Sequence, residues 1–162
     1  MDLYARDPKG KWRWAAATRP SKQEMQATLL SGITPGMREY AVYLPLYNGT
    51  ESLAIGVPAG AKFERLAPRE AKPLIFYGTS ITHGACASRP GMAHPAILGR
   101  RLDMPVINIG FSGNGKMHAA VGDLMAEVDA AAYIIDCLPN MNAAAVKAHC
   151  VPLMKQLRKA RP

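Results

Sequence analysis

The sequence predicts an α/β protein in two parts, a small antiparallel β module followed by a parallel sheet with helices on both faces. After Pro73 the order strand, glycine-rich turn and helix occurs three times, whereas the first 70 or so residues hold short β-like pieces divided by turn residues. Between them, LAPREAKP (residues 66–73) has two prolines and three charged residues that interrupt any regular element. We therefore expect one unit over residues 1–70 and a second over 71–162.

The β-like pieces of the first unit are bounded by turn signals. Tyr40, Val42, Leu44 and Leu46 alternate as in a half-buried strand. The three pieces are KWRWAAA (11–17), EYAVYLPLY (39–47) and SLAIGV (52–57), and the turn signals are DPKG, TPG, NGT and PAGA. This pattern predicts antiparallel strands.

In the second unit, each apolar strand leads through a polar turn into an amphipathic helix. The expected strands are LIFYG (74–78), PVINIG (105–110) and AAYIIDC (131–137), and the expected helices lie near residues 94–102, 117–128 and 142–160. Ligands bind parallel sheets at the carboxyl ends of their strands. The turns GTS, SGNG and LPN all fall at those ends, which predicts a site there.

Composition restricts the class of protein. The chain is 49% apolar, which is typical of a globular protein, and no apolar run approaches the roughly 20 residues that span a bilayer. The formal charge is +8, but the basic residues are scattered apart from the terminal KQLRKARP, so we expect no nucleic-acid partner. The polar, charged N-terminus does not read as a signal peptide, and the sequence leaves the compartment open.

The three cysteines, Cys86, Cys137 and Cys150, lack the spacing of a disulfide framework or a structural zinc site. Cys137 ends an apolar run and is expected to pack as a small hydrophobic residue. Cys86 has no base placed beside it by the sequence. We expect neither a metal nor an organic cofactor.

One interpretation of the turns is phosphate binding. GFSGNGKM (110–117) matches G-x-x-x-x-G-K, and Asp136 ends an apolar strand as a metal-binding Asp would. A P-loop needs Ser or Thr after the lysine, however, and Met117 is a poor ligand for Mg²⁺. This interpretation also leaves Ser80 and Asn140 without a role.

The other interpretation is acyl transfer, which needs a nucleophile and preorganised oxyanion donors. Ser80 follows a strand and Gly78 at the start of a helical turn. Gly113 lets its backbone N–H approach a substrate, and the Asn140 side chain can donate to the same oxygen. Taken singly, Ser80 could be a helix cap, Asn140 a cap or turn residue, and Gly113 a glycine that supplies a positive φ. Their joint placement at three strand ends favours an active site.

These residues carry a resemblance. GTSITHG, NIGFSGNG and IIDCLPNM are similar to the first three sequence blocks of the SGNH (GDSL-type) hydrolase superfamily, and DLYARDPKGKWRW resembles the small β module that precedes the hydrolase domain in one bacterial branch. The resemblance implies a three-layer α/β/α, flavodoxin-like domain. It also implies a Ser80 nucleophile and an oxyanion hole formed by the Ser80 amide, Gly113 and Asn140. The implied reaction is ester hydrolysis, with small acyl esters of carbohydrates as the first choice of substrate.

The family's Asp-x-x-His block is absent, since none of His83, His94, His118 and His149 has an Asp three residues earlier. We therefore expect a hydrolase domain that is incomplete at its C-terminus. His83 could act as a substitute base, but a pocket-lining role is the stronger expectation, shared with Asn114 and His118.

Two further expectations follow from an incomplete domain. The alternative to an esterase is a truncated or degenerate SGNH-like domain that binds a ligand without turnover. An uncovered sheet edge would also favour self-association.

Overall fold

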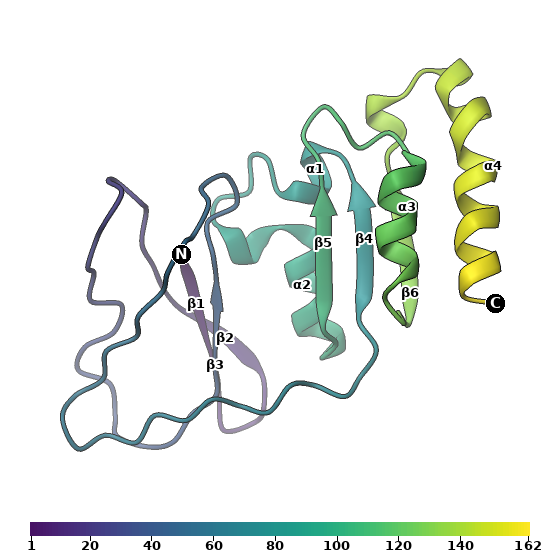
Figure 1. Ribbon diagram of the computed structural model, residues 1–162. Helices are drawn as coiled ribbons and strands as arrows, with labels where there is room; N and C mark the ends of the chain where they lie inside the picture. The colour runs from purple at the N-terminus through teal and green to yellow at the C-terminus, as the bar shows by residue number, and fades with distance from the viewer.

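The computed structural model describes residues 1–162 and contains two three-stranded sheets, an antiparallel one near the N-terminus and a parallel one beside it (Figure 1). The antiparallel sheet has the order β2-β1-β3, and the parallel sheet has the order β5-β4-β6. The strands are β1 (Asp2–Arg6), β2 (Trp12–Ala17), β3 (Tyr40–Tyr43), β4 (Leu74–Gly78), β5 (Val106–Gly110) and β6 (Ala132–Asp136). The predicted α/β class is confirmed.

The antiparallel sheet differs from the sequence expectation in two strands, one that was not expected and one that does not form. Its central strand is β1, which pairs with both β2 and β3 and buries Asp2, Leu3 and Tyr4. The expected strand SLAIGV (52–57) is wrong, because these residues form no regular element and leave Leu53 and Ile55 exposed. Apolar residues in this run mimic a strand, but no neighbouring strand pairs with them. The expected strand at 39–47 ends at Tyr43.

The parallel sheet agrees with the expected strands. All five residues of its central strand β4 are buried, because helices cover both faces of the sheet (Figure 1). Ile75 and Tyr77 pack in a core cluster with Met125 of α3 and Leu153 of α4. Phe76 points to the opposite face, where its ring lies 5.7 Å from the ring of His94 at the start of α2.

The helices also lie close to their expected positions. They are α1 (Ser80–His83), α2 (His94–Leu102), α3 (Ala119–Ala126) and α4 (Ala143–Ala160), with short 3₁₀ turns at Pro90–Met92 (η1) and Leu138–Asn140 (η2). α3 begins two residues later than expected, because Met117 takes a positive φ of 59° and buries its side chain in the core. No helix combines the length and the apolar character that crossing a membrane requires.

A buried carboxylate joins the antiparallel sheet to the segment that precedes α2. Asp2 is fully buried, and its carboxylate accepts hydrogen bonds from the Gly91 amide at 2.8 Å and the Trp14 indole at 3.0 Å. The Arg89 guanidinium lies 3.4 Å away and supplies the opposite charge. Gly91 cannot be replaced without movement, because a Cβ there would lie 2.4 Å from the ring of Tyr4. The antiparallel sheet therefore meets the turn before α2 through a carboxylate that has hydrogen-bond donors and an opposite charge, as a buried carboxylate requires.

Candidate active site

The register of the parallel sheet brings three turns to one edge. Gly78, the last residue of β4, pairs with Gly110 at the end of β5 and with Asp136 at the end of β6. The turn after each strand therefore starts at the same level. Ser80, Gly113 and Asn140 lie on these three turns, as the sequence predicted for a site at the carboxyl ends of the strands.

Ser80 is the first residue of α1, and it is not the helix cap. The cap is the buried Thr79, whose hydroxyl accepts a hydrogen bond from the Ile81 amide at 3.2 Å. The Ser80 hydroxyl forms no hydrogen bond within the chain, and the amide of a first helical residue has no intrahelical acceptor. Both groups are therefore available to a ligand.

The turn after β5 presents the Gly113 amide. Gly113 has a φ of +74°, and its N–H donates to no group of the chain, whereas the amides of Asn114 and Gly115 both donate to the Phe111 carbonyl, at 3.1 and 3.0 Å. Gly115 rests directly on the end of β4, since a Cβ there would lie 2.0 Å from the Gly78 carbonyl oxygen. The turn is thus held close to the residue that precedes Thr79 and Ser80.

Asn140 ends η2, and its side-chain Nδ2 donates to the Phe111 carbonyl at 3.5 Å. This contact places the amide at the turn that carries Gly113. Asn140 does not cap α4, because Asn142 does so by accepting a hydrogen bond from the Ala145 amide at 2.9 Å. The structure therefore does not show Asn140 in the alternative role of a helix cap.

Two polar residues that sequence reasoning did not single out, Thr82 and Asn108, hold α1 in place together with Asp136. The buried Thr82 donates from its hydroxyl to the Asp136 carboxylate at 2.9 Å. Asn108 of β5 donates to the Thr82 carbonyl at 2.9 Å and accepts from the Gly110 amide at 3.0 Å. Asn108 is the only polar side chain in the apolar strand β5, and this isolation in the sequence is the signal that could have identified it. The helix that begins with Ser80 is fixed from both neighbouring strands.

His83 is engaged by the antiparallel module. Its Nε2 donates to the Leu46 carbonyl, and the Tyr47 ring lies over the imidazole with centroids 4.5 Å apart. Its Nδ1 is buried and has no hydrogen-bond partner. No hydrogen bond joins His83 to Ser80, so the geometry that a general base needs is not present between them.

The other two predicted site residues lie along the chain after β5. Asn114 is exposed at the turn beside Gly113. The His118 amide donates to the Tyr77 hydroxyl at 3.1 Å, and its ring approaches that of His149 edge-on at 6.5 Å. His118 thus lies where α3 and α4 meet.

Two buried groups near the site stay protonated at neutral pH. Burial raises the pKa of the Cys137 thiol and the pKa of the Tyr77 phenol above their ordinary values. Cys137 packs in the core, as the sequence predicted. The side chain of Met117 also points into the core, so the position that would carry the magnesium-binding hydroxyl of a P-loop does not face a ligand.

Comparisons with known proteins agree on the kind of protein that this chain resembles. Residues 71–162 match the family described as GDSL-like lipase/acylhydrolase, and residues 1–63 match the family described as the N-terminus of SGNH hydrolase-type esterases. A crystal structure described as a GDSL-like lipase from Bacteroides ovatus is 38% identical, with a TM-score of 0.93. The match covers 99% of this chain and 48% of that chain, so this chain spans about half the length of its structural relative. No curated protein matches the chain.

Proposed function

The chain belongs to the GDSL-like lipase/acylhydrolase family, and from that premise we propose that it is a serine esterase acting through Ser80. The observation that supports this most directly is the strand register, which sets the turns of Ser80, Gly113 and Asn140 at one edge of the sheet. Each of the three residues offers a group that is not consumed by the fold's own regular hydrogen bonds.

The proposed reaction is attack of the Ser80 Oγ on the carbonyl carbon of an ester. The carbonyl oxygen becomes an oxyanion, which accepts hydrogen bonds from the Ser80 amide, the Gly113 amide and the Asn140 Nδ2. Each such donor typically contributes about 3 kcal/mol to the transition state. The alcohol leaves with a proton, and water then releases the acid from the acyl-serine and restores the hydroxyl.

The base that accepts the Ser80 proton is not assigned within residues 1–162. Asp136 accepts a hydrogen bond from Thr82 and His83 donates one to Leu46, so both have structural partners. The proposal for the whole reaction therefore rests on the nucleophile and the oxyanion donors.

As substrates we propose small acyl esters of carbohydrates. The support is the N-terminal match to SGNH hydrolase-type esterases together with the resemblance of residues 2–14 to the module found before the hydrolase domain in one branch. An ester of this kind presents a small acyl group to the oxyanion donors and a bulky polar alcohol to the surface.

Turnover of p-nitrophenyl acetate tests the proposal. We expect Ser80→Ala to remove any hydrolysis by the protein, and Ser88→Ala, which changes an exposed serine in the loop after α1, to leave it unchanged. Hydrolysis that survives Ser80→Ala would overturn the assignment of the nucleophile.

A second candidate, a domain that binds acylated carbohydrate without turnover, is favoured by one observation. The Ser80 hydroxyl has no histidine hydrogen-bonded to it, and loss of the base from a serine triad costs several orders of magnitude in rate. Calorimetric binding of an acetylated xylose without release of acetate would support this candidate over the esterase.

A further inference from the structure

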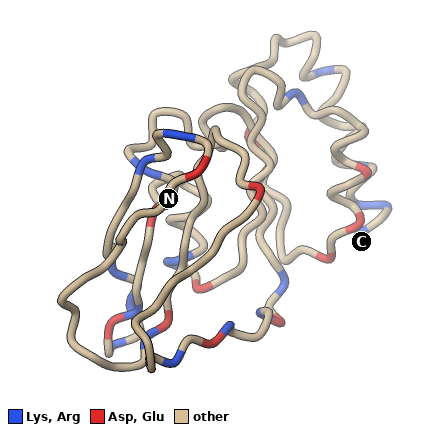
Figure 2. The backbone as a smooth tube through the Cα atoms, turned by 60° about the vertical axis from the view of Figure 1, so that its left-hand side comes forward, with Lys and Arg blue, Asp and Glu red and all other residues tan.

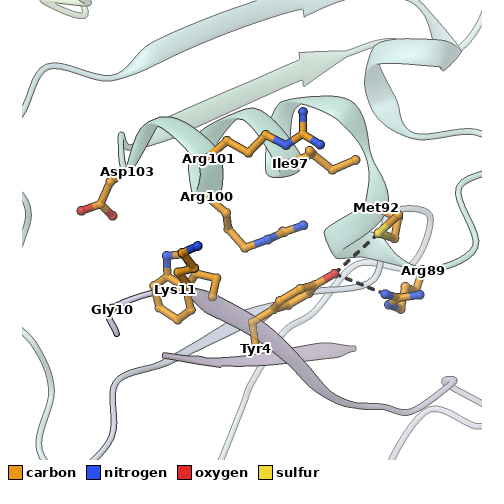
Figure 3. A pocket seen from close by; sticks show the side chains of 10 residues that line it. Tyr4, Gly10, Lys11, Arg89, Met92, Ile97, Arg100, Arg101 and Asp103 are labelled. Carbon is orange, nitrogen blue, oxygen red and sulfur yellow. Dashed lines mark hydrogen bonds between the residues drawn. The ribbon is translucent and has the colours of Figure 1, made fainter. Parts of the chain in front are cut away.

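A second cavity of the molecule lies away from the ends of the parallel strands. It has a volume of about 660 Å³ and opens between the β1–β2 hairpin and helix α2 (Figure 3). Its lining residues are Tyr4, Gly10, Lys11, Trp12, Arg89, Met92, Ile97, Arg100, Arg101 and Asp103. None of them belongs to the turns that carry Ser80, Gly113 or Asn140.

The pocket carries an excess of positive charge. Its cations are Lys11, Arg89, Arg100 and Arg101, and its single acid is Asp103. Asp103 is already paired with two cations outside the pocket, Arg6 and Arg69. The ion pairs of the chain include none with Lys11, Arg100 or Arg101.

This concentration of charge is local. The three strands of the parallel sheet contain no Lys or Arg. The other basic residues lie in the antiparallel module, the connecting loops, α2 and α4, and they form no single stripe (Figure 2). Three unneutralised cations around one concavity create a positive potential there, because the low-dielectric walls concentrate the field. An anionic ligand would relieve that potential.

Arg100 is fixed in its position in the pocket wall. Its Nη2 donates to the Gly91 carbonyl at 2.6 Å, and its guanidinium lies over the Tyr4 ring at 3.9 Å. Its Nη1 is buried and has no acceptor. A buried donor without a partner costs free energy, so this wall holds a cation whose hydrogen bonds are not all made within the chain. Lys11 and Arg101 are exposed at the rim and can adjust to a ligand.

The rest of the lining is apolar. Trp12, Met92 and Ile97 contribute carbon surface beside the cations, as Figure 3 shows for Met92 and Ile97. The volume falls in the range of sites for small organic ligands, roughly 300–1,000 Å³. A sugar ring has apolar C–H faces that suit such a surface, and a carboxylate on the ring suits the cations.

We propose that this pocket binds an acidic saccharide of one or two rings, with its carboxylate at Lys11, Arg100 and Arg101 and its ring against the apolar wall. Arginine is suited to this role because its planar guanidinium meets a carboxylate with two hydrogen bonds. The site is separate from Ser80, and the proposal holds whether or not Ser80 hydrolyses an ester.

Isothermal titration calorimetry of the full chain with glucuronate and with digalacturonate tests the proposal, with glucose as the neutral control. The pocket variant is Lys11→Gln with Arg101→Gln, two exposed changes that leave the Arg100–Tyr4 stack in place. The matched control is Lys147→Gln with Lys155→Gln on α4, which removes the same charge far along the chain. Thermal melts verify that both variants fold.

At low salt we expect glucuronate to bind and glucose not to bind. We expect the pocket variant to weaken glucuronate binding at least about tenfold, since two charge-assisted contacts are lost. The α4 variant should stay within about twofold, because Lys147 and Lys155 do not line the pocket and no contact to the ligand is lost.

The proposal would be overturned by the absence of glucuronate binding, by equal binding of glucose, or by equal weakening in the pocket and α4 variants. Binding of inorganic sulfate as tight as that of glucuronate would show that the sugar ring contributes nothing, and would overturn the assignment to a saccharide. None of these results depends on ester hydrolysis, so a failure here is distinguishable from a failure of the proposed function.

Discussion

The Tyr47 ring lies over the imidazole ring of His83, with centroids 4.5 Å apart and planes inclined by 40°. The neighbouring Leu46 packs against Gly84, where a Cβ would lie 2.6 Å from the Leu46 Cδ1. A segment from the N-terminal module therefore reaches the short helix that begins with Ser80. The module and the candidate active site are structurally coupled.

The first prediction concerns that coupling. His83→Ala removes the donor to the Leu46 carbonyl and the ring beneath Tyr47, so we expect a loss of about 1–2 kcal/mol in the free energy of unfolding. His83→Gln retains an N–H donor and should recover part of that loss. Urea unfolding measures both variants, and equal stability of His83→Ala and the parent chain would show that the contact contributes nothing.

The second prediction separates catalysis from stability at two asparagines. Asn140→Ala removes a proposed oxyanion donor whose one hydrogen bond is long, so we expect kcat to fall about 100-fold with little change in melting temperature. Asn142→Ala removes the cap of α4, so we expect a loss of about 1 kcal/mol in stability with kcat unchanged. Esterase assays and thermal melts of both variants check the pair. A stability loss without a rate loss in Asn140→Ala would contradict its proposed role.

The third prediction compares two glycines of one turn. Gly115→Ala would place a Cβ 2.0 Å from the Gly78 carbonyl oxygen, which forces the backbone apart, so we expect a loss of more than about 3 kcal/mol. Gly113 has open space around it and only its φ of +74° opposes a side chain. Gly113→Ala should therefore cost only about 1–2 kcal/mol. Denaturant unfolding measures the free energy of unfolding of both variants, and equal values for the two would contradict this ranking.

The fourth prediction is a pH dependence at Asp103. A hydrogen bond from Arg69, with the charges of Arg69 and Arg6, holds the pKa of the Asp103 carboxyl below its ordinary value. The folded state thus binds this proton less readily than the unfolded state. The stabilisation is present above the ordinary carboxyl pKa of about 3.9 and is lost as the pH falls through the lower folded value.

Asp103→Asn tests this because asparagine also tolerates the residue's positive φ of 53°. We expect a small deficit in melting temperature relative to the parent chain, constant above about pH 5 and vanishing in acid. The deficit stays small because Asp103 is more than half exposed. A deficit that grows on acidification would contradict the assigned direction.

The fifth prediction concerns the edges of the parallel sheet. β5 and β6 are its outermost strands, and Ile107 of β5 is 37% exposed. Because unpaired strand edges attract further strands, we propose that copies of this chain associate through β5. Light scattering should show a mass that rises with protein concentration, and Ile107→Lys should reduce the rise. A monodisperse monomer at all concentrations would contradict this proposal.

The sequence predicted the parallel sheet well because its strands are apolar runs that end in glycine-rich turns. The meeting of Ser80, Gly113 and Asn140 at one edge followed from the rule for parallel strands, and the register of Gly78, Gly110 and Asp136 satisfies it. Strand β1 was missed because DLYAR has charged ends and no clear alternation. SLAIGV was assigned wrongly because alternation alone does not supply a pairing partner.

The polar contacts around α1 could not be predicted, since each joins residues distant in sequence. Thr82 and Asp136 are 54 positions apart, and Leu46 and His83 are 37 apart. Local pattern carries no information about which distant carbonyl or carboxylate will face a given side chain. Such contacts appear only when the sheet register and the packing of the module are known.

The buried carboxylate of Asp2 limits how relatives can be recombined. A chimera that joins the N-terminal segment of one parent to the hydrolase segment of another must keep Asp2 and Trp14 compatible with Gly91 across the junction. A parent with a larger residue than glycine at position 91 would be a poor donor for this module. Crossovers in a library of such chimeras should therefore be selected by the pairing at residues 2 and 91, rather than by the composition of the linker alone.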